Sequence, residues 1–217
     1  MTTRERIIDE ALTLFSQRGF EGVTVKEIAQ AVGIKDSSLY KHFPSKQAIF
    51  GEIIDQMEIR LNQMHAVLQV PDARRQDVSN FFSRQSSQSM TEMVEQMFIF
   101  YLRDPIVGRI RRLFTIEQFG NSTIAQQYGS LFIESALDYH VQVFSQMIAS
   151  GAFLAGDPNL MALQFYSPIF LLLSKVDLHP ETENEAILLL NQHVMDFGTR
   201  HGNREGAPTV SSEMENI

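Results

Sequence analysis

The sequence predicts an all-α protein with a small N-terminal three-helix domain and a larger helical C-terminal domain. Two capping boxes support helices near the N-terminus, because Thr2 and Thr24 each stand three residues before a glutamate, Glu5 or Glu27. In such a box the hydroxyl accepts from the glutamate amide, and the carboxylate accepts from the threonine amide. Beyond residue 48, apolar residues recur at helical spacing along several long segments.

The N-terminal region divides into three short helices. The first runs to Gly19 and carries one apolar stripe, and the second covers about residues 25–32. Gly33 ends the second helix, because glycine tolerates a left-handed conformation at a tight turn. A third helix, from about residue 36 to 42, buries Leu39 and Phe43 and leaves Asp36 to cap it or to accept from a cytosine. These elements have the form of a helix-turn-helix.

The third helix exposes hydrogen-bonding side chains that folding does not need. They are Lys35, Ser37, Ser38, Tyr40, Lys41 and His42. Two interpretations are open: the helix enters the DNA major groove, where base edges carry a full donor and acceptor code, or it is merely a solvated helix. The capping box, the glycine turn and the following PSK favour DNA binding. Arg4 and Arg6 are then either a basic arm that approaches DNA or ordinary surface charges.

At these residues the chain resembles the TetR family of transcriptional regulators. The family has a strong first helix, a TVxxIAxxxGIxxxxLYxHFxSK core and a following long helix, and residues 6–20, 24–46 and 50 onward match it. The resemblance covers about the first fifty residues. It implies that Tyr40, His42, Thr24 and Lys46 approach phosphates. It also implies that Ser37, Ser38 and Lys41, with Lys35 beside them, approach base edges of a palindromic operator in double-stranded DNA.

Charge is distributed unevenly along the chain. The net charge is −8, but residues 1–46 carry +1 and the remainder carries −9. Because +1 neutralises few phosphates, a single subunit should bind DNA weakly, and we expect affinity to require a dimer.

The C-terminal region predicts further helices and a partner. A long helix from about residue 45 to 67 joins the two halves without a flexible linker, and further helices are expected at about 75–102, 106–119 and 123–150. The last two helices are apolar on more than one face, which favours a homodimer over a deep monomer core. A four-helix interface is also what the family resemblance implies. The expected interface residues are Phe170, Leu171, Leu190, Val194 and Phe197.

Methionine and phenylalanine are abundant between residues 81 and 170. Methionine adapts to irregular ligands, but a stripe at helical spacing is also what an ordinary core looks like. The resemblance implies an effector pocket for a mainly apolar small molecule. Its expected lining is Met64, Met93, Met97, Tyr101, Phe114, Tyr128, Phe132 and Phe165.

Other classes of protein find little support in the sequence. The chain has no cysteine, and its six histidines form no HExxH or HxxxH pair, so we expect no metal, no cofactor and no enzymatic activity. There is no signal peptide or membrane span, which predicts a cytoplasmic protein.

We therefore expect a DNA-binding domain at residues 1–48, an effector-binding and dimerisation domain at 49–201, and a disordered tail at 202–217. The corresponding function is a ligand-released homodimeric repressor. Two alternatives stay open: a DNA-binding dimer that senses a protein or has no small-molecule effector, and an activator or corepressor-type regulator.

Overall fold

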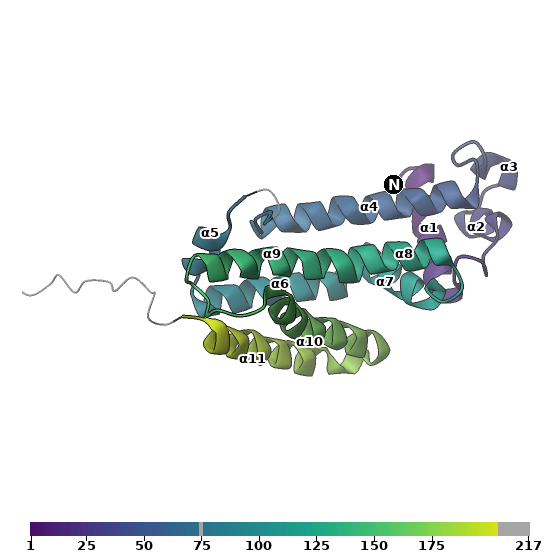
Figure 1. Ribbon diagram of the computed structural model, residues 1–217. Coiled ribbons are helices and arrows are strands. Elements are labelled where there is room, and N and C mark those ends of the chain that lie inside the picture. Colours follow the sequence, from purple (N-terminus) through teal and green to yellow (C-terminus); the bar gives the residue numbers. More distant parts are fainter. Residues whose placement is uncertain (74–75, 204–217) are drawn as a thin grey trace, which may run out of the picture.

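A computed structural model describes residues 1–73 and 76–203, and within them the fold is helical without a strand. The tail expected at 202–217 lies outside the described residues from residue 204 onward. Its first two residues are described: Gly202 forms an isolated bridge with Phe153, and the Asn203 amide donates to the Ala152 carbonyl at 2.9 Å. Figure 1 shows α4 running from the small N-terminal domain along the larger helical domain. The helices are α1 (Thr3–Arg18), α2 (Val25–Val32), α3 (Asp36–Leu39), α4 (Lys46–Val67), α5 (Ser79–Ser83), α6 (Ser87–Arg103), α7 (Pro105–Glu117), α8 (Ser122–Gly129), the π-helix η1 (Ser130–Glu134), α9 (Ser135–Ala149), α10 (Pro158–Leu178), the 3-10 helix η2 (Pro180–Thr182) and α11 (Glu183–His201).

The first two helices, α1 and α2, begin and end where the sequence predicts. Both capping boxes are present, at Thr2 with Glu5 and at Thr24 with Glu27. Gly33 has φ 77° and ψ 33°, the left-handed conformation that a side chain would disfavour, and its amide donates to carbonyls of α2. The tight turn between α2 and α3 therefore follows from the sequence.

The third helix, α3, is shorter than the helix expected from about residue 36 to 42. Regular α-helix ends at Leu39, and residues 40–42 continue as a hydrogen-bonded turn in which the His42 amide donates to the Leu39 carbonyl at 2.9 Å. Lys35 is the N-cap residue and no side chain caps the helix, so Asp36 does not have the capping role. The buried side chains of Leu39 and Phe43 nevertheless fix both ends of this segment.

Two long helices predicted in the second domain are interrupted. In place of one helix over 75–102 there are α5 and α6, and Ser86 begins the second by accepting the Ser89 amide at 3.0 Å. Serine competes for backbone hydrogen bonds, which explains why the polar stretch SRQSSQS breaks the helix. Residue 75 lies outside the described residues. The helix predicted over 123–150 contains η1, whose Phe132 carbonyl accepts from the Tyr166 hydroxyl at 2.5 Å.

A buried ion pair joins α7 to the last part of the domain. Arg111 on α7 donates from Nε and Nη2 to both carboxylate oxygens of Asp177 on α10, at 2.7 and 2.5 Å. Its Nη1 donates to the Tyr101 carbonyl at the end of α6, at 2.6 Å. Leaving either charge unpaired would cost several kcal/mol, roughly 3–5. The pair therefore holds α6, α7 and α10 in one arrangement.

Helix α10 is the one helix in the described part of the chain that is long and apolar enough to cross a membrane by length and composition. Its inner side chains, including Phe165, Leu172 and Val176, lie in the core of the second domain. Leu163 and Leu171 are exposed on its outer face. The core and this outer stripe together account for its apolar composition.

Candidate nucleic-acid interface

Residues 35–42, which comprise α3 with its N-cap and the following turn, form the recognition segment. This segment presents its polar side chains to solvent at one end of the molecule. Lys35, Ser37, Lys41 and His42 are exposed, and Tyr40 keeps 53% of its surface accessible. Ser38, which was also expected to approach bases, is half-buried. Figure 1 shows α2 and α3 at the end of the molecule opposite α5. Within residues 1–73 and 76–203, the side chains of this segment are left accessible, so a duplex can reach it.

Arginines of the N-terminal domain stabilise the helix-turn-helix from within. The Arg4 guanidinium donates to the His42 carbonyl at 3.1 Å, pairs with Glu52 at 2.5 Å and lies 4.3 Å from the centre of the Phe43 ring. Arg6 donates to the Val32 carbonyl at the end of α2. Arg4 thus holds the end of the recognition segment and Arg6 holds the end of α2, so both arginines have structural partners.

Two of the expected phosphate-binding groups are also engaged inside the domain. Lys46 donates to the carbonyls of Phe20 and Val23, at 2.8 and 3.0 Å, and lies over the Phe20 ring. The Thr24 hydroxyl donates to the Glu27 carboxylate at 2.7 Å. These contacts secure the loop between α1 and α2, and the approach of either residue to a phosphate stays a prediction.

The Glu27 carboxylate is a strong local acceptor. The Thr24 amide and hydroxyl donate to it, and Arg18 pairs with it at 2.7 Å. The Thr24 backbone hydrogen bond, then the Thr24 hydroxyl and then Arg18 lower the pKa of Glu27 to about 2. The cap is consequently charged at any physiological pH, as the start of a helix favours.

Three lysines remain for phosphates. Among the residues that the structure describes, Lys26, Lys35 and Lys41 make no ion pair or side-chain hydrogen bond, and all three are exposed. Sequence reasoning missed Lys26, at the start of α2. The signal that could have found it is position, because Lys26 directly follows the Thr24 cap and points away from the buried stripe of α2. Of these three cations, Lys26 lies on α2, and Lys35 and Lys41 lie just before and just after α3.

The residues expected to line an effector pocket do not come together. Phe114, Tyr128 and Phe132 pack on one another in the core shared with the N-terminal domain, with ring centres 5.6 to 6.2 Å apart. Phe165 lies in the other core, and Tyr101 packs against both. This is a correction: these side chains build cores. Burial raises the pKa of Tyr101 to about 12, so its hydroxyl stays protonated.

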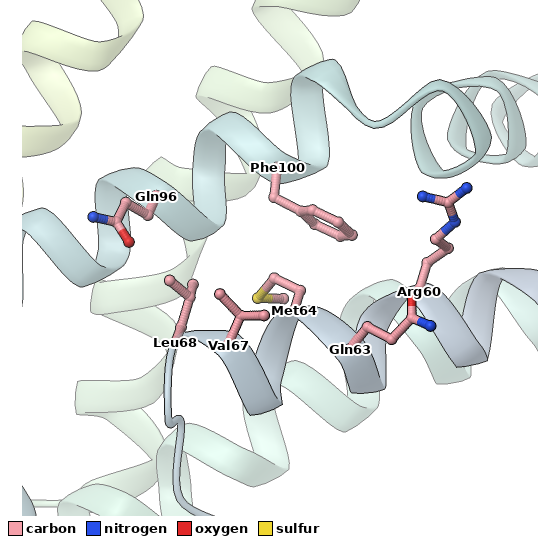
Figure 2. A pocket seen from close by; sticks show the side chains of 7 residues that line it. All are labelled: Arg60, Gln63, Met64, Val67, Leu68, Gln96 and Phe100. Carbon is pink, nitrogen blue, oxygen red and sulfur yellow. The ribbon is translucent and has the colours of Figure 1, made fainter.

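The expected pocket methionines occupy other places. Met97 on α6 is half-buried. Met64 lines a groove of about 280 Å³ between α4 and α6, and Met93 lines an adjoining recess of about 300 Å³. Figure 2 shows the Phe100 ring over the side chains of α4, with Arg60 at one end of the groove. The groove and the recess thus open on the surface between these two helices.

The expected dimer interface is also revised. Leu190, Val194 and Phe197 are buried in the core of the single chain, Leu190 completely, so they cannot face a partner. Phe170 is half-buried against the first core. Leu171 alone fits the expectation, with 67% of its surface exposed. Helical spacing locates an apolar face but does not say whether the same chain or another covers it.

Metal binding finds no support in the described residues. No group of three or more His, Asp or Glu side chains is placed there to hold an ion. His193 donates from Nε2 to the Phe165 carbonyl at 2.9 Å, and His140 donates from Nδ1 to the Ala136 carbonyl at 2.7 Å. Both histidines therefore have structural partners in the second core.

Known proteins match this chain in two ways. The profile of "Bacterial regulatory proteins, tetR family" matches residues 7–53. The negative transcriptional regulator IcaR of the biofilm operon icaADBC in Staphylococcus aureus is 47% identical over 51 residues, which are 24% of this chain and 27% of IcaR. The chain therefore matches only about a quarter of the length of that relative, namely its helix-turn-helix part.

Solved structures extend the likeness to the whole fold. A Mesorhizobium loti protein described as a TetR-family transcriptional regulator has a TM-score of 0.66 at 18% identity, covering 93% of this chain and 97% of that one. SmeT in complex with triclosan has a TM-score of 0.61 at 17% identity, covering 100% and 99%; SmeT is the repressor of a Stenotrophomonas maltophilia multidrug efflux pump. The helix-turn-helix part of the chain matches the profile of the tetR family, and the fold of the whole chain is similar to that of these solved structures.

Proposed function

We propose that this protein is a homodimeric repressor that binds a palindromic operator and is released by a mainly apolar small molecule. The observation that carries the proposal is the recognition segment, whose exposed side chains stand on a domain in which Arg4 holds the end of that segment. Ser37, Tyr40 and Lys41 can reach base edges and phosphates in a major groove, which admits an α-helix.

Assembly into a dimer is supported by an apolar stripe on α10 and α11. The stripe consists of exposed side chains: Leu160, Leu163, Leu171, Leu178, Leu188, Leu189 and Met195. Large exposed apolar patches mark interaction sites, and a two-fold axis would bury the same stripe of two chains at once. Two heads would then read half-sites roughly 34–36 Å apart, or a related spacing. A dimer also doubles the number of phosphate contacts, because a single N-terminal domain of net charge +1 neutralises few phosphates.

Ligand release has a physical route through α4. Ile49 and Ile53 of this helix are fully buried in the core of the N-terminal domain, and Met64 lines the groove at its other end. A ligand that displaces the C-terminal end of α4, at the groove, would tilt this helix and move the N-terminal domain. The separation between the recognition segments of the two chains would then change. Release requires only that the ligand binds the DNA-incompetent arrangement more tightly, and a coupling of about 1–3 kcal/mol is sufficient.

Helix α7 offers a second connection to the head. Arg109 on α7 pairs with Asp9 on α1 at 2.7 Å. At the other end of α7, a Cβ on Gly19 would collide with the Glu117 carboxylate, so the two domains fit closely there. A shift of α7 would therefore be felt by α1, which supports the recognition segment.

Repression, rather than activation, is supported by the relatives. IcaR is a negative regulator by name, and SmeT is a repressor found in complex with triclosan, a mainly apolar molecule. We infer that this protein acts in the cytoplasm, where its operator is.

A genome-wide binding footprint tests the DNA-binding part of the proposal. We expect a few palindromic sites next to promoters, with higher expression of the adjacent genes when the protein is deleted. Scattered binding without a shared motif would contradict operator recognition, and lower expression after deletion would make the protein an activator.

Reciprocity tests the ligand part. If a ligand releases DNA, the operator must weaken ligand binding by the same factor. Affinity for an effector is therefore measured with and without operator. Equal affinities would contradict coupling, and tighter binding with DNA would identify a corepressor.

A further inference from the structure

The groove between α4 and α6 has an apolar floor that is open to solvent. Met64 and Phe100 form its centre, and Val67 keeps 79% of its surface exposed although it is apolar. In Figure 2 these side chains point toward one another across the gap between the helices. Leaving such a surface uncovered is unfavourable in water, so an apolar ligand of suitable shape would be stabilised here.

One end of the groove carries a positive charge, that of Arg60, whose ion pair is long. The Arg60 guanidinium is 44% exposed, and its one ion-pair contact within the described residues, to Asp104, is long at 3.4 Å. Five N–H donors in a planar fork suit a carboxylate, which binds such a fork bidentately. An anionic head group can therefore bind Arg60 better than Asp104 does.

The opposite end repels an anion. The adjoining recess shares Val67, Leu68 and Gln96 with the groove and continues to Glu92. A negative head is thus favoured at Arg60 and disfavoured at the far end, which fixes the direction of the ligand. Seven residues of α4 separate Arg60 from Val67, about 10 Å along the helix, which matches roughly eight methylene groups.

From this geometry, and resting on the ligand-released function proposed above, we infer that the effector is an elongated amphiphile with one anionic head. Its carboxylate binds Arg60 and its apolar tail lies along Met64, Val67 and Phe100. Loss of Arg60 affects Asp104, whose other oxygen caps α7 by accepting the amides of residues 106 and 107 at 2.9 and 3.1 Å. When the ligand carboxylate replaces Asp104 as the partner of Arg60, the start of α7 loses a contact. Because α7 contacts α1 through Arg109, a resulting shift of α7 would also move the DNA-binding domain.

Decanoate is the probe, with decyltrimethylammonium and 1-decanol as controls of equal tail length, all below their micelle concentrations. Binding to the full chain is followed by the shift of its melting temperature and by calorimetry. We expect saturable binding of decanoate and much weaker binding of both controls. Arg60→Gln should weaken decanoate binding about tenfold or more, whereas Arg200→Gln, at an exposed ion-paired arginine on α11, should leave it unchanged.

A second variant tests the placement of the tail. Val67→Glu adds a carboxylate on an exposed position, so the fold is retained, and it should abolish decanoate binding. Equal binding of decanoate and decyltrimethylammonium, or wild-type affinity of Arg60→Gln, would overturn the inference. Binding of the protein to a selected operator is measured separately, without any amphiphile. If the protein does not bind the operator, the proposed function is contradicted. If it binds the operator but decanoate never releases it, only the inferred class of effector is contradicted.

Discussion

Arg109 of the larger domain and Asp9 of the DNA-binding domain are joined by an ion pair of 2.7 Å, although 100 residues separate them in sequence. The same guanidinium donates to the Thr13 hydroxyl at 2.7 Å. Arg109 thus contacts two successive turns of α1, and α7 and α1 behave as one unit.

A double-mutant cycle measures this connection. Arg109→Met and Asp9→Asn should each destabilise the protein, and their coupling energy should be about 1 kcal/mol, because Asp9 is half-exposed and solvent screens the pair. Arg112→Met, at an exposed position on the same helix, is the matched control and should change the free energy of unfolding little. Urea unfolding gives all four values, and a coupling energy of zero would show that the ion pair does not connect the domains energetically.

Acid should destabilise the larger domain through His140. Its ring packs against Phe165 and Tyr166, with centres 5.1 and 5.7 Å away, and burial lowers its pKa from 6.5 to about 4. The unfolded chain therefore takes up a proton more readily between pH 6.5 and 4, so stability is fully present above pH 6.5 and falls as the pH falls. Between pH 7 and 5 the loss should be on the order of 2 kcal/mol.

The control for that prediction is His140→Phe. This ring cannot be protonated, so the variant should lose much less stability between pH 7 and 5 in urea unfolding. An unchanged pH dependence would assign the acid sensitivity to other groups.

Leu171 and Leu190 should respond differently to the same substitution. Leu171→Glu places a carboxylate on the exposed stripe and should give a folded monomer with little DNA affinity. Leu190→Glu places it in the core, so it should lower the free energy of unfolding by more than about 3 kcal/mol. Sedimentation and circular dichroism distinguish the two, and a folded Leu171→Glu dimer would contradict the proposed interface.

The same pair of leucines shows how far sequence reasoning reaches. The sequence places both on apolar helix faces, but only packing decides that Leu190 is buried where α11 packs on α6 and α10, while Leu171 stays outside. Local features were predictable, because capping boxes and the Gly33 turn depend on residues within one helical turn. The effector residues were not, because Phe114 or Tyr128 looks the same in sequence whether it lines a cavity or fills a core.

The partners of the cations in the N-terminal domain could not be predicted from the sequence either. Lys46 and Arg4 are charged residues beside the recognition segment, and sequence reasoning offered both to DNA. Their contacts with backbone carbonyls come from residues 23 to 38 positions away, which no local pattern reveals. Charge alone therefore does not show which cations are uncommitted, as Lys26 and Lys41 are within the described residues.

Tyr40 and Lys41 should contribute differently to DNA binding. Tyr40→Ala removes a hydrogen bond and packing, so it should weaken binding to every sequence by about 1–2 kcal/mol per subunit. Lys41→Ala should reduce the dependence of log affinity on log salt by about one per subunit if Lys41 contacts a phosphate. Arg200→Ala, on α11, is the control. A salt titration in which Tyr40→Ala binds like the wild type would refute the placement of this segment.

Selection of binding sites from a pool of random duplexes tests the central claim most directly. The wild-type protein should enrich one palindromic sequence whose half-sites are about 34–36 Å apart or at a related helical spacing, bound by two chains. The Leu171→Glu monomer should enrich nothing under the same conditions. Enrichment of single half-sites by the wild type, or binding that depends on salt but not on sequence, would contradict a dimeric operator-binding regulator.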